Sequence, residues 1–282
     1  MIKPILIVST LLGILLFSCN DNSQNSTAKK SVRQSSFVDL QTDFKKWWIY
    51  HNQNITFDLD FVGKDQEGKQ LTKKEFFTLT ASGLYLIEKK SVIDGINQYQ
   101  LVKTDHNIDK SINSTLKGIG NDALHNLKME GKLFPQFSFR DVNGKAYSNE
   151  AIKGKTVIVK CWFIGCTACI KEFPELNALV AAHQDREDLL FLSLAQDDDA
   201  DLIQFLKKKT FAYEVVGNQT GFMDDDLSIR KYPTHIVIGK DGVVERVFDT
   251  VKGIENFLGY QTENEELKES QLPPPAPVSK PL

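Results

Sequence analysis

From about residue 134 onwards, apolar positions recur with two periods in turn, one typical of strands and one of helices. Continuous apolar runs at Val157–Phe163 and Leu189–Leu194 predict strands that are buried on both faces. Between them, apolar residues at helical spacing predict a helix over Ala168–His183, which Pro174 should kink or weaken. This order of elements is typical of an α/β domain.

Shorter elements complete this half of the chain. Turn residues at Asp141–Gly144 and Lys240–Gly242 each predict a hairpin between flanking strands. Acidic triplets before two apolar stretches are typical of helix starts, and capping explains them better than metal binding does. The remaining predicted elements are strands at Phe137–Arg140, Ala146–Ser148, Tyr213–Val216, Thr234–Ile238 and Val243–Phe248, and helices at Leu202–Lys208 (after Asp197–Asp199), Leu227–Tyr232 (after Asp224–Asp226) and Gly253–Tyr260.

The region from 37 to 126 carries no chemical motif, and its role is left open between holding a substrate, docking a partner and acting as a spacer. Its pattern predicts a small, mainly antiparallel β domain followed by a helical connector at Leu116–Met129. Of the adjacent Trp47 and Trp48, one is expected to point into the core, because side chains alternate along a strand. The predicted strands are Trp47–His51, Ile55–Val62, Phe76–Thr80, Leu84–Lys89 and Gln98–Lys103.

The first 18 residues have the features of a targeting segment. Lys3 precedes an apolar run, Ile5–Phe17, that is short for a membrane-spanning helix. Its end, Leu16–Cys19, resembles the bacterial lipobox, which implies cleavage before Cys19 and lipidation of its sulfur. An ordinary secretory peptide is the alternative. The predicted organisation is a signal peptide (1–18), a flexible tether (19–36), the β domain (37–126), a second domain (127–262) and a disordered Pro-rich tail (263–282).

Composition argues against one class of partner, and the cysteine spacing indicates a chemistry. The net charge is −3, and no basic cluster with interleaved aromatic residues is present, which argues against nucleic acid as a partner. Among the four cysteines, one pair is spaced as Cys166-Thr167-Ala168-Cys169, directly after a predicted strand and at the start of a predicted helix. A helix start favours thiolates, so this setting favours redox chemistry. Half of a zinc site is the alternative, but no second pair accompanies it.

The remaining internal cysteine, Cys161, lies inside an apolar run. A small core residue is the favoured interpretation, because apolar surroundings oppose thiolate formation. A third redox thiol is the alternative.

Three segments together resemble thiol–disulfide oxidoreductases of the TlpA/ResA type, which belong to the thioredoxin-like superfamily. They are Trp162–Leu176, Tyr232-Pro233-Thr234 and the hairpin Pro135–Gly144, and the resemblance covers about 134 to 260. It implies an α/β thioredoxin-like fold, with a central mixed sheet flanked by helices, preceded here by the small mainly-β domain. It also implies that no cofactor and no metal take part.

The resemblance assigns roles to particular residues. Cys166 is implied to be the exposed nucleophile, and Cys169 the buried sulfur that resolves the mixed disulfide. Glu172 is implied to raise the thiol pKa values and to relay a proton to or from Cys169. Pro233 is implied to be cis. The expected substrate-binding residues are Gly165, Tyr232, Pro233 and Thr234.

Three features depart from familiar relatives. Gly165 replaces an aromatic residue and should open the rim above the first cysteine. Thr167-Ala168 leaves the reduction potential undetermined, because this dipeptide tunes it. Lys160 stands where thioredoxins keep a buried acid, so it either points toward the sulfurs and lowers their pKa or points outward into solvent.

The predicted function is a membrane-anchored thiol–disulfide oxidoreductase that faces the periplasm or another extracytoplasmic space and acts as a reductant. The implied partners are cysteine-bearing envelope proteins, apocytochrome c among them, and a separate membrane electron donor. A peroxiredoxin is disfavoured, because Phe163 stands where that family has threonine. Two non-enzymatic functions compete with this prediction, a copper chaperone and a non-catalytic binding lipoprotein, and His235 fits a copper site poorly.

Overall fold

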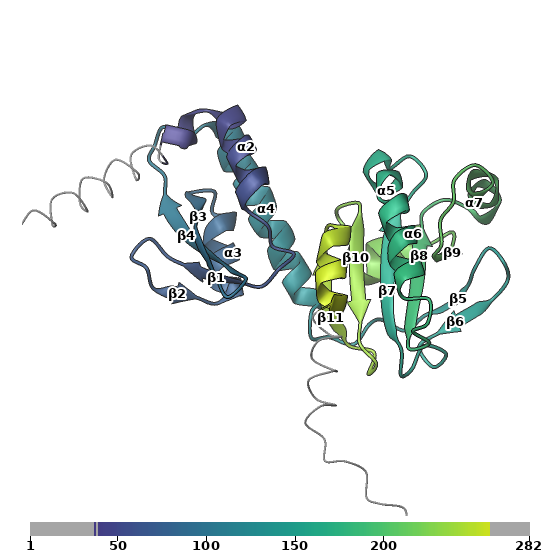
Figure 1. The fold of residues 1–282 in the computed structure, drawn as a ribbon. Coiled ribbons are helices and arrows are strands. Elements are labelled where there is room, and N and C mark those ends of the chain that lie inside the picture. Colours follow the sequence, from purple (N-terminus) through teal and green to yellow (C-terminus); the bar gives the residue numbers. More distant parts are fainter. Residues whose placement is uncertain (1–36, 38, 260–282) are drawn as a thin grey trace, which may run out of the picture.

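The computed structural model describes residue 37 and residues 39–259, which form a four-stranded sheet, a five-stranded sheet and a two-stranded hairpin, with their helices (Figure 1). The predicted signal peptide, the tether with Cys19 and the C-terminal tail lie outside these residues. Within the described part of the chain, no helix combines the length and apolar character needed to cross a membrane.

The C-terminal sheet has five strands in the order β11-β10-β7-β8-β9. Strands β7, β8 and β9 run parallel, while β10 is antiparallel to β7 and β11 is antiparallel to β10. The predicted central mixed sheet is therefore confirmed. Its strands are β7 (Thr156–Trp162), β8 (Leu189–Ala195), β9 (Glu214–Val216), β10 (Thr234–Ile238) and β11 (Val244–Phe248).

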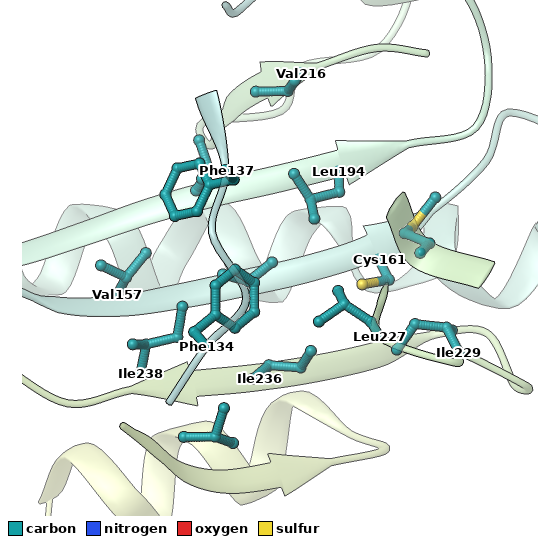
Figure 2. Close-up of a cluster of buried hydrophobic side chains, with 14 of the residues drawn as sticks. Phe134, Phe137, Val157, Cys161, Leu194, Val216, Leu227, Ile229, Ile236 and Ile238 are labelled. Atoms are coloured by element: carbon teal, nitrogen blue, oxygen red, sulfur yellow. The ribbon is translucent and has the colours of Figure 1, made fainter. Parts of the chain in front are cut away.

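Hydrophobic residues cover both faces of this sheet. Alternate residues of β7, Val157, Val159 and Cys161, point into the cluster drawn in Figure 2 together with Phe134 and Phe137. The other face packs under helices α5 (Thr167–Lys171) and α6 (Phe173–Ala182). The predicted single helix is thus two helices, which meet at Glu172, and Pro174 lies in the first turn of α6, where its missing N–H is tolerated.

Of the two helices predicted after acidic triplets, one is confirmed and the other is wrong. Asp198 caps helix α7 (Asp199–Leu206) by accepting a hydrogen bond from the backbone N–H of Asp201, which confirms an acidic helix start. The helix predicted at Leu227–Tyr232 is wrong, because Asp224–Asp226 lie inside a short π-helix, η2 (Phe222–Asp226), instead of preceding a helix. Proline at 233 also disfavours helical backbone in the residue before it. A closing helix covers residues 251–259.

Both edges of the five-stranded sheet carry additional backbone contacts. Along β11, the N–H of Gly131 donates to the carbonyl of Val244, and the N–H of Val244 donates to the carbonyl of Lys132, both at 2.8 Å. At β9, the N–H of Val142 donates to the carbonyl of Val215 at 2.9 Å. Val142 follows the predicted hairpin strand β5 (Ser138–Arg140) and precedes its partner β6 (Ala146–Ser148).

The N-terminal part contains a four-stranded sheet in the order β2-β1-β4-β3, in which β1 and β4 are parallel and the other pairs antiparallel. Helices accompany it, so this part is more helical than its sequence predicts. Its elements are η1 (Asp39–Thr42), α2 (Phe44–Asn54), β1 (Phe61–Lys64), β2 (Gln70–Leu71), α3 (Lys73–Ala81), β3 (Tyr85–Ile93), β4 (Ile96–Lys103) and α4 (Lys110–Met129).

Two predicted strands are wrong, because Trp47–His51 belongs to helix α2 and Phe76–Thr80 belongs to helix α3. A third, Ile55–Val62, is a strand only from Phe61 onward. Side-chain caps explain both helices. Asp43 accepts a hydrogen bond from the backbone of the first turn of α2, and a capping box starts α3. The prediction that one of the adjacent tryptophans points inward is confirmed, since Trp47 is 1% exposed and Trp48 is 41% exposed.

Candidate active site

The Cys-x-x-Cys pair closes a disulfide at the start of helix α5. The two Cα atoms are 5.3 Å apart. Cys166 is the N-cap residue, and its Sγ accepts a hydrogen bond from the backbone N–H of Cys169 at 3.1 Å. Cys166 is 7% exposed, whereas Cys169 is fully buried. Cys166 is therefore the sulfur that another protein can reach first, as its predicted role as nucleophile requires, although it is more buried than that prediction implies.

The loop that carries the first cysteine is anchored by a residue that the sequence did not single out for this purpose. The Asp197 carboxylate accepts a hydrogen bond from the backbone N–H of Ile164 at 2.7 Å. In the sequence, Asp197 reads only as one of three carboxylates at a helix start, and the cap itself is Asp198. An aspartate two residues after the end of a buried parallel strand was the available signal, since such positions lie at the edge of the sheet where a neighbouring parallel strand also ends.

The predicted substrate-binding segment lies beside the dithiol. The Tyr232–Pro233 peptide bond is cis, as predicted. The Tyr232 ring packs edge-on against Phe163 with centroids 5.4 Å apart, and its hydroxyl accepts a hydrogen bond from the Gln196 side chain at 3.0 Å. Thr234 pairs with Cys161 at the start of strand β10. The chain thus brings Tyr232, Pro233 and Thr234 to the end of strand β7, next to the loop of the first cysteine.

Gly165 is exposed in that loop. A Cβ atom added there would lie 3.2 Å from the Phe163 ring, so a larger residue would press on that ring. The open rim above Cys166 stays a prediction.

Polar side chains form a buried row across the centre of the sheet. His235 of β10 pairs with Lys160 of β7, which in turn pairs with Ser193 of β8. Paired residues of neighbouring strands point to the same face. All three residues are 0% exposed. Lys160 lies two residues from both Ile158 and Trp162 on the same strand, so its side chain points to the same face as theirs. The row therefore lies on the face that α5 and α6 cover.

Glu172, at the junction of α5 and α6, completes this group. Its Oε2 accepts a hydrogen bond from Lys160 Nζ at 2.6 Å and lies 3.1 Å from His235 Nε2. When that carboxylate is ionised, His235 donates from Nε2, and its Nδ1 has no hydrogen-bond partner among the described residues. Lys160 is therefore not a solvated side chain. The sequence left this alternative open and did not connect His235 with Glu172.

Burial and pairing decide the charges of this group. Burial lowers the pKa of Lys160, and the nearby Glu172 carboxylate offsets part of that shift. Burial also lowers the pKa of His235. For Glu172, burial alone would raise the pKa, but hydrogen bonding to His235 and the Lys160 charge together hold it below its usual value. The 2.6 Å contact therefore pairs Lys160 with a carboxylate whose ionised form is favoured, while burial favours the neutral form of His235.

Cys161 lies on the opposite face of strand β7, in the cluster of Figure 2. It is fully buried, and burial raises the pKa of its thiol to about 12. A thiolate at that site is disfavoured at physiological pH, which confirms Cys161 as a core residue.

Comparison with known proteins agrees with this arrangement. The AhpC/TSA family matches residues 131–247. The chain is 29% identical over 127 residues to the thiol-disulfide oxidoreductase ResA of Bacillus thuringiensis, covering 45% of this chain and 72% of that protein. It is 26% identical over 119 residues to the thiol:disulfide interchange protein DsbE of Pseudomonas fluorescens, covering 42% and 65%. The thioredoxin domain of a Bacteroides vulgatus thiol-disulfide oxidoreductase aligns with a TM-score of 0.43 and 21% identity, covering 47% of this chain and 96% of that one.

The mixed sheet, the disulfide at a helix start and the similarity to ResA and DsbE define a thiol–disulfide oxidoreductase with a thioredoxin-like fold. More particularly, the C-terminal half of the chain is similar to the thiol-disulfide oxidoreductase ResA.

Proposed function

We propose that this protein is a membrane-anchored reductant of disulfides in cell-envelope proteins, with Cys166 and Cys169 as its reactive couple and Cys19 as the site of lipid attachment. The observation that carries the proposal is the disulfide at the start of α5, in which Cys166 keeps 7% exposure and Cys169 has none. Similarity to ResA and DsbE supports an extracytoplasmic location.

In the reducing direction, the Cys166 thiolate attacks one sulfur of the client disulfide. The client S–S bond breaks, a mixed disulfide forms, and the first client sulfur leaves as a thiolate. Cys169 then loses its proton and attacks the Cys166 sulfur, which releases the second client thiolate. The client gains two electrons and two protons, and the enzyme is left with its Cys166–Cys169 disulfide.

Glu172 is proposed to take the proton from Cys169 in the second step. It lies three residues after Cys169, is ionised by its contacts with Lys160 and His235, and keeps 17% of its side chain exposed. An ionised carboxylate with partial access to solvent can accept a proton and pass it on.

The client is proposed to bind as an extended segment against the backbone of Tyr232, with Pro233 and Thr234 continuing that surface. Backbone pairing of this kind accepts many sequences, and the open rim at Gly165 leaves room for different side chains around the cysteine. Apocytochrome c is one client that fits this description. The enzyme leaves each cycle oxidised, so a separate membrane-bound donor of electrons is part of the proposal.

The equilibrium reduction potential of the chain from residue 20 onward tests the direction of electron flow. We expect a value nearer to that of thioredoxin, about −270 mV, than to that of DsbA, about −120 mV. A value near the second figure would refute the reductant, because every 30 mV or so corresponds to a tenfold change in the equilibrium constant. Absence of a reversible intramolecular disulfide would refute the whole redox assignment.

Trapping experiments test the two cysteine roles. With a disulfide-containing peptide, Cys169→Ser should accumulate a mixed disulfide with the peptide, because the resolving sulfur is missing. Cys166→Ser should form little of it, because the buried Cys169 is shielded. The opposite pattern would show that the roles are reversed.

A further inference from the structure

Lys160 occupies a position that a core would normally fill with an apolar residue. Its strand neighbours on the same face are Ile158 and Trp162, both 0% exposed, and Lys160 is equally buried. Removing an ammonium group from water costs several kcal/mol even after the protein relaxes. Its partner Glu172 is itself mostly buried. A pair this costly for stability invites a functional explanation.

The charges of Lys160 and Glu172 offer a functional explanation for this buried pair. An isolated carboxylate near two thiols raises their pKa values, because its field opposes thiolate formation. Here the Lys160 ammonium lies 2.6 Å from the carboxylate of Glu172, so the two present a short dipole with no net charge. His235 holds the same carboxylate oxygen from the neighbouring strand β10, which restricts where that dipole points.

We propose that Lys160 is a positioning residue that sets the reactivity of the dithiol, keeping Glu172 ionised while cancelling most of its field at Cys166 and Cys169, and that His235 fixes the carboxylate in place. The proposal rests on the assignment of Cys166 and Cys169 as the reactive couple. It explains how one carboxylate can stay ready to accept a proton without suppressing the thiolates that start the reaction.

Other titratable groups act on this cluster from the elements packed around it. Burial raises the pKa values of both Tyr213, which interacts with Glu172, and Cys161, which interacts with Lys160, so both are neutral at pH 7. Asp249, beyond strand β11, acts on His235. None of these three provides a cation near Glu172, so the neutralising charge is that of Lys160.

The test is the apparent pKa of the Cys166 thiol in the reduced protein, measured from the pH dependence of its alkylation by iodoacetamide. Lys160→Met should raise this pKa by roughly one unit, the lower end of what a nearby charge produces, and slow alkylation about tenfold at neutral pH. Glu172→Gln should lower it. The double variant should lie between the single variants, near the wild-type value, because both charges are then absent.

Lys171→Met is the matched control, since Lys171 is exposed and adjacent to Glu172, and it should leave the thiol pKa unchanged. If Lys160→Met alone does not fold, comparison of Glu172→Gln with the double variant isolates the Lys160 charge. Equal thiol pKa values in that comparison, or an unshifted Lys160→Met, would overturn the proposal. Reversible disulfide formation measured on the same wild-type sample separates this result from failure of the proposed function.

Discussion

Replacing Lys160 with methionine should destabilise the oxidised protein by an amount that depends strongly on pH. Breaking a buried ion pair on one side costs about 3–5 kcal/mol when the remaining charge stays ionised. Glu172 can escape that cost by taking a proton. From its ordinary pKa of 4.5, protonation at pH 7 costs at most about 3.4 kcal/mol, at roughly 1.36 kcal/mol per pH unit. Lys160→Met is therefore expected to lower the free energy of unfolding at pH 7 by about 1–3 kcal/mol. The lower values apply if His235 takes the proton in place of Glu172.

Acidification should reduce the loss. The folded variant binds one proton that its unfolded chain does not bind above pH 4.5, so its stability relative to wild type rises as the pH falls. At pH 5, neutralising Glu172 costs only about 0.7 kcal/mol, and the expected loss is below about 1 kcal/mol. The disulfide is kept closed in this experiment so that the two active-site thiols do not titrate.

Urea unfolding followed by circular dichroism at pH 7 and pH 5 measures both losses. Lys171→Met, an exposed lysine next to Glu172, should show neither the loss nor its pH dependence. A loss that stays constant or grows at pH 5 would refute an ionised Lys160–Glu172 pair in the folded protein. A Lys160→Met variant as stable as wild type at pH 7 would also refute an ionised Lys160–Glu172 pair.

Two further predictions concern the N-terminal part. Gly120→Ala should lower the free energy of unfolding in urea by about 1–3 kcal/mol, because its new methyl group would overlap Ala81 where α4 crosses α3. Gly118→Ala, in the same helix with open space around it, should raise that free energy by about 0.5–1 kcal/mol. Similar values for both variants would contradict this packing. Burial lowers the pKa of His51 to about 4. Below about pH 6.5 the unfolded chain therefore binds a proton that the folded state does not. The free energy of unfolding should fall by up to roughly 3 kcal/mol as the pH drops from 6.5 to 4. The difference between wild type and His51→Gln in urea unfolding across this pH range measures that contribution, and a constant difference would contradict it.

The C-terminal half could be predicted from its sequence because its signals are local. Buried parallel strands read as continuous apolar runs, and a proline marks the break between α5 and α6. The N-terminal part misled the same reasoning. The aromatic residues around Trp47 and Phe76 have high strand propensity, but tertiary packing and the caps at Asp43 and Thr72 make both segments helical.

The site was predictable only in part, for a related reason. The cysteines, Glu172 and Pro233 belong to motifs that a sequence displays directly. The row formed by His235 and Lys160 depends on the register of β10 against β7, two strands that are far apart in the chain. No local pattern specifies that register, so the contacts of Glu172 emerge only from the fold.

The contacts along the two outer strands of the five-stranded sheet have a consequence for association. An unpaired strand edge is a template on which another chain can add by backbone pairing. Residues 131–132 occupy positions along β11, and Val142 occupies one beside β9. At these positions a second copy of the domain meets backbone groups that are already paired, which limits edge-to-edge stacking there. The two edges are thereby partly covered within the domain itself, which disfavours aggregation through them.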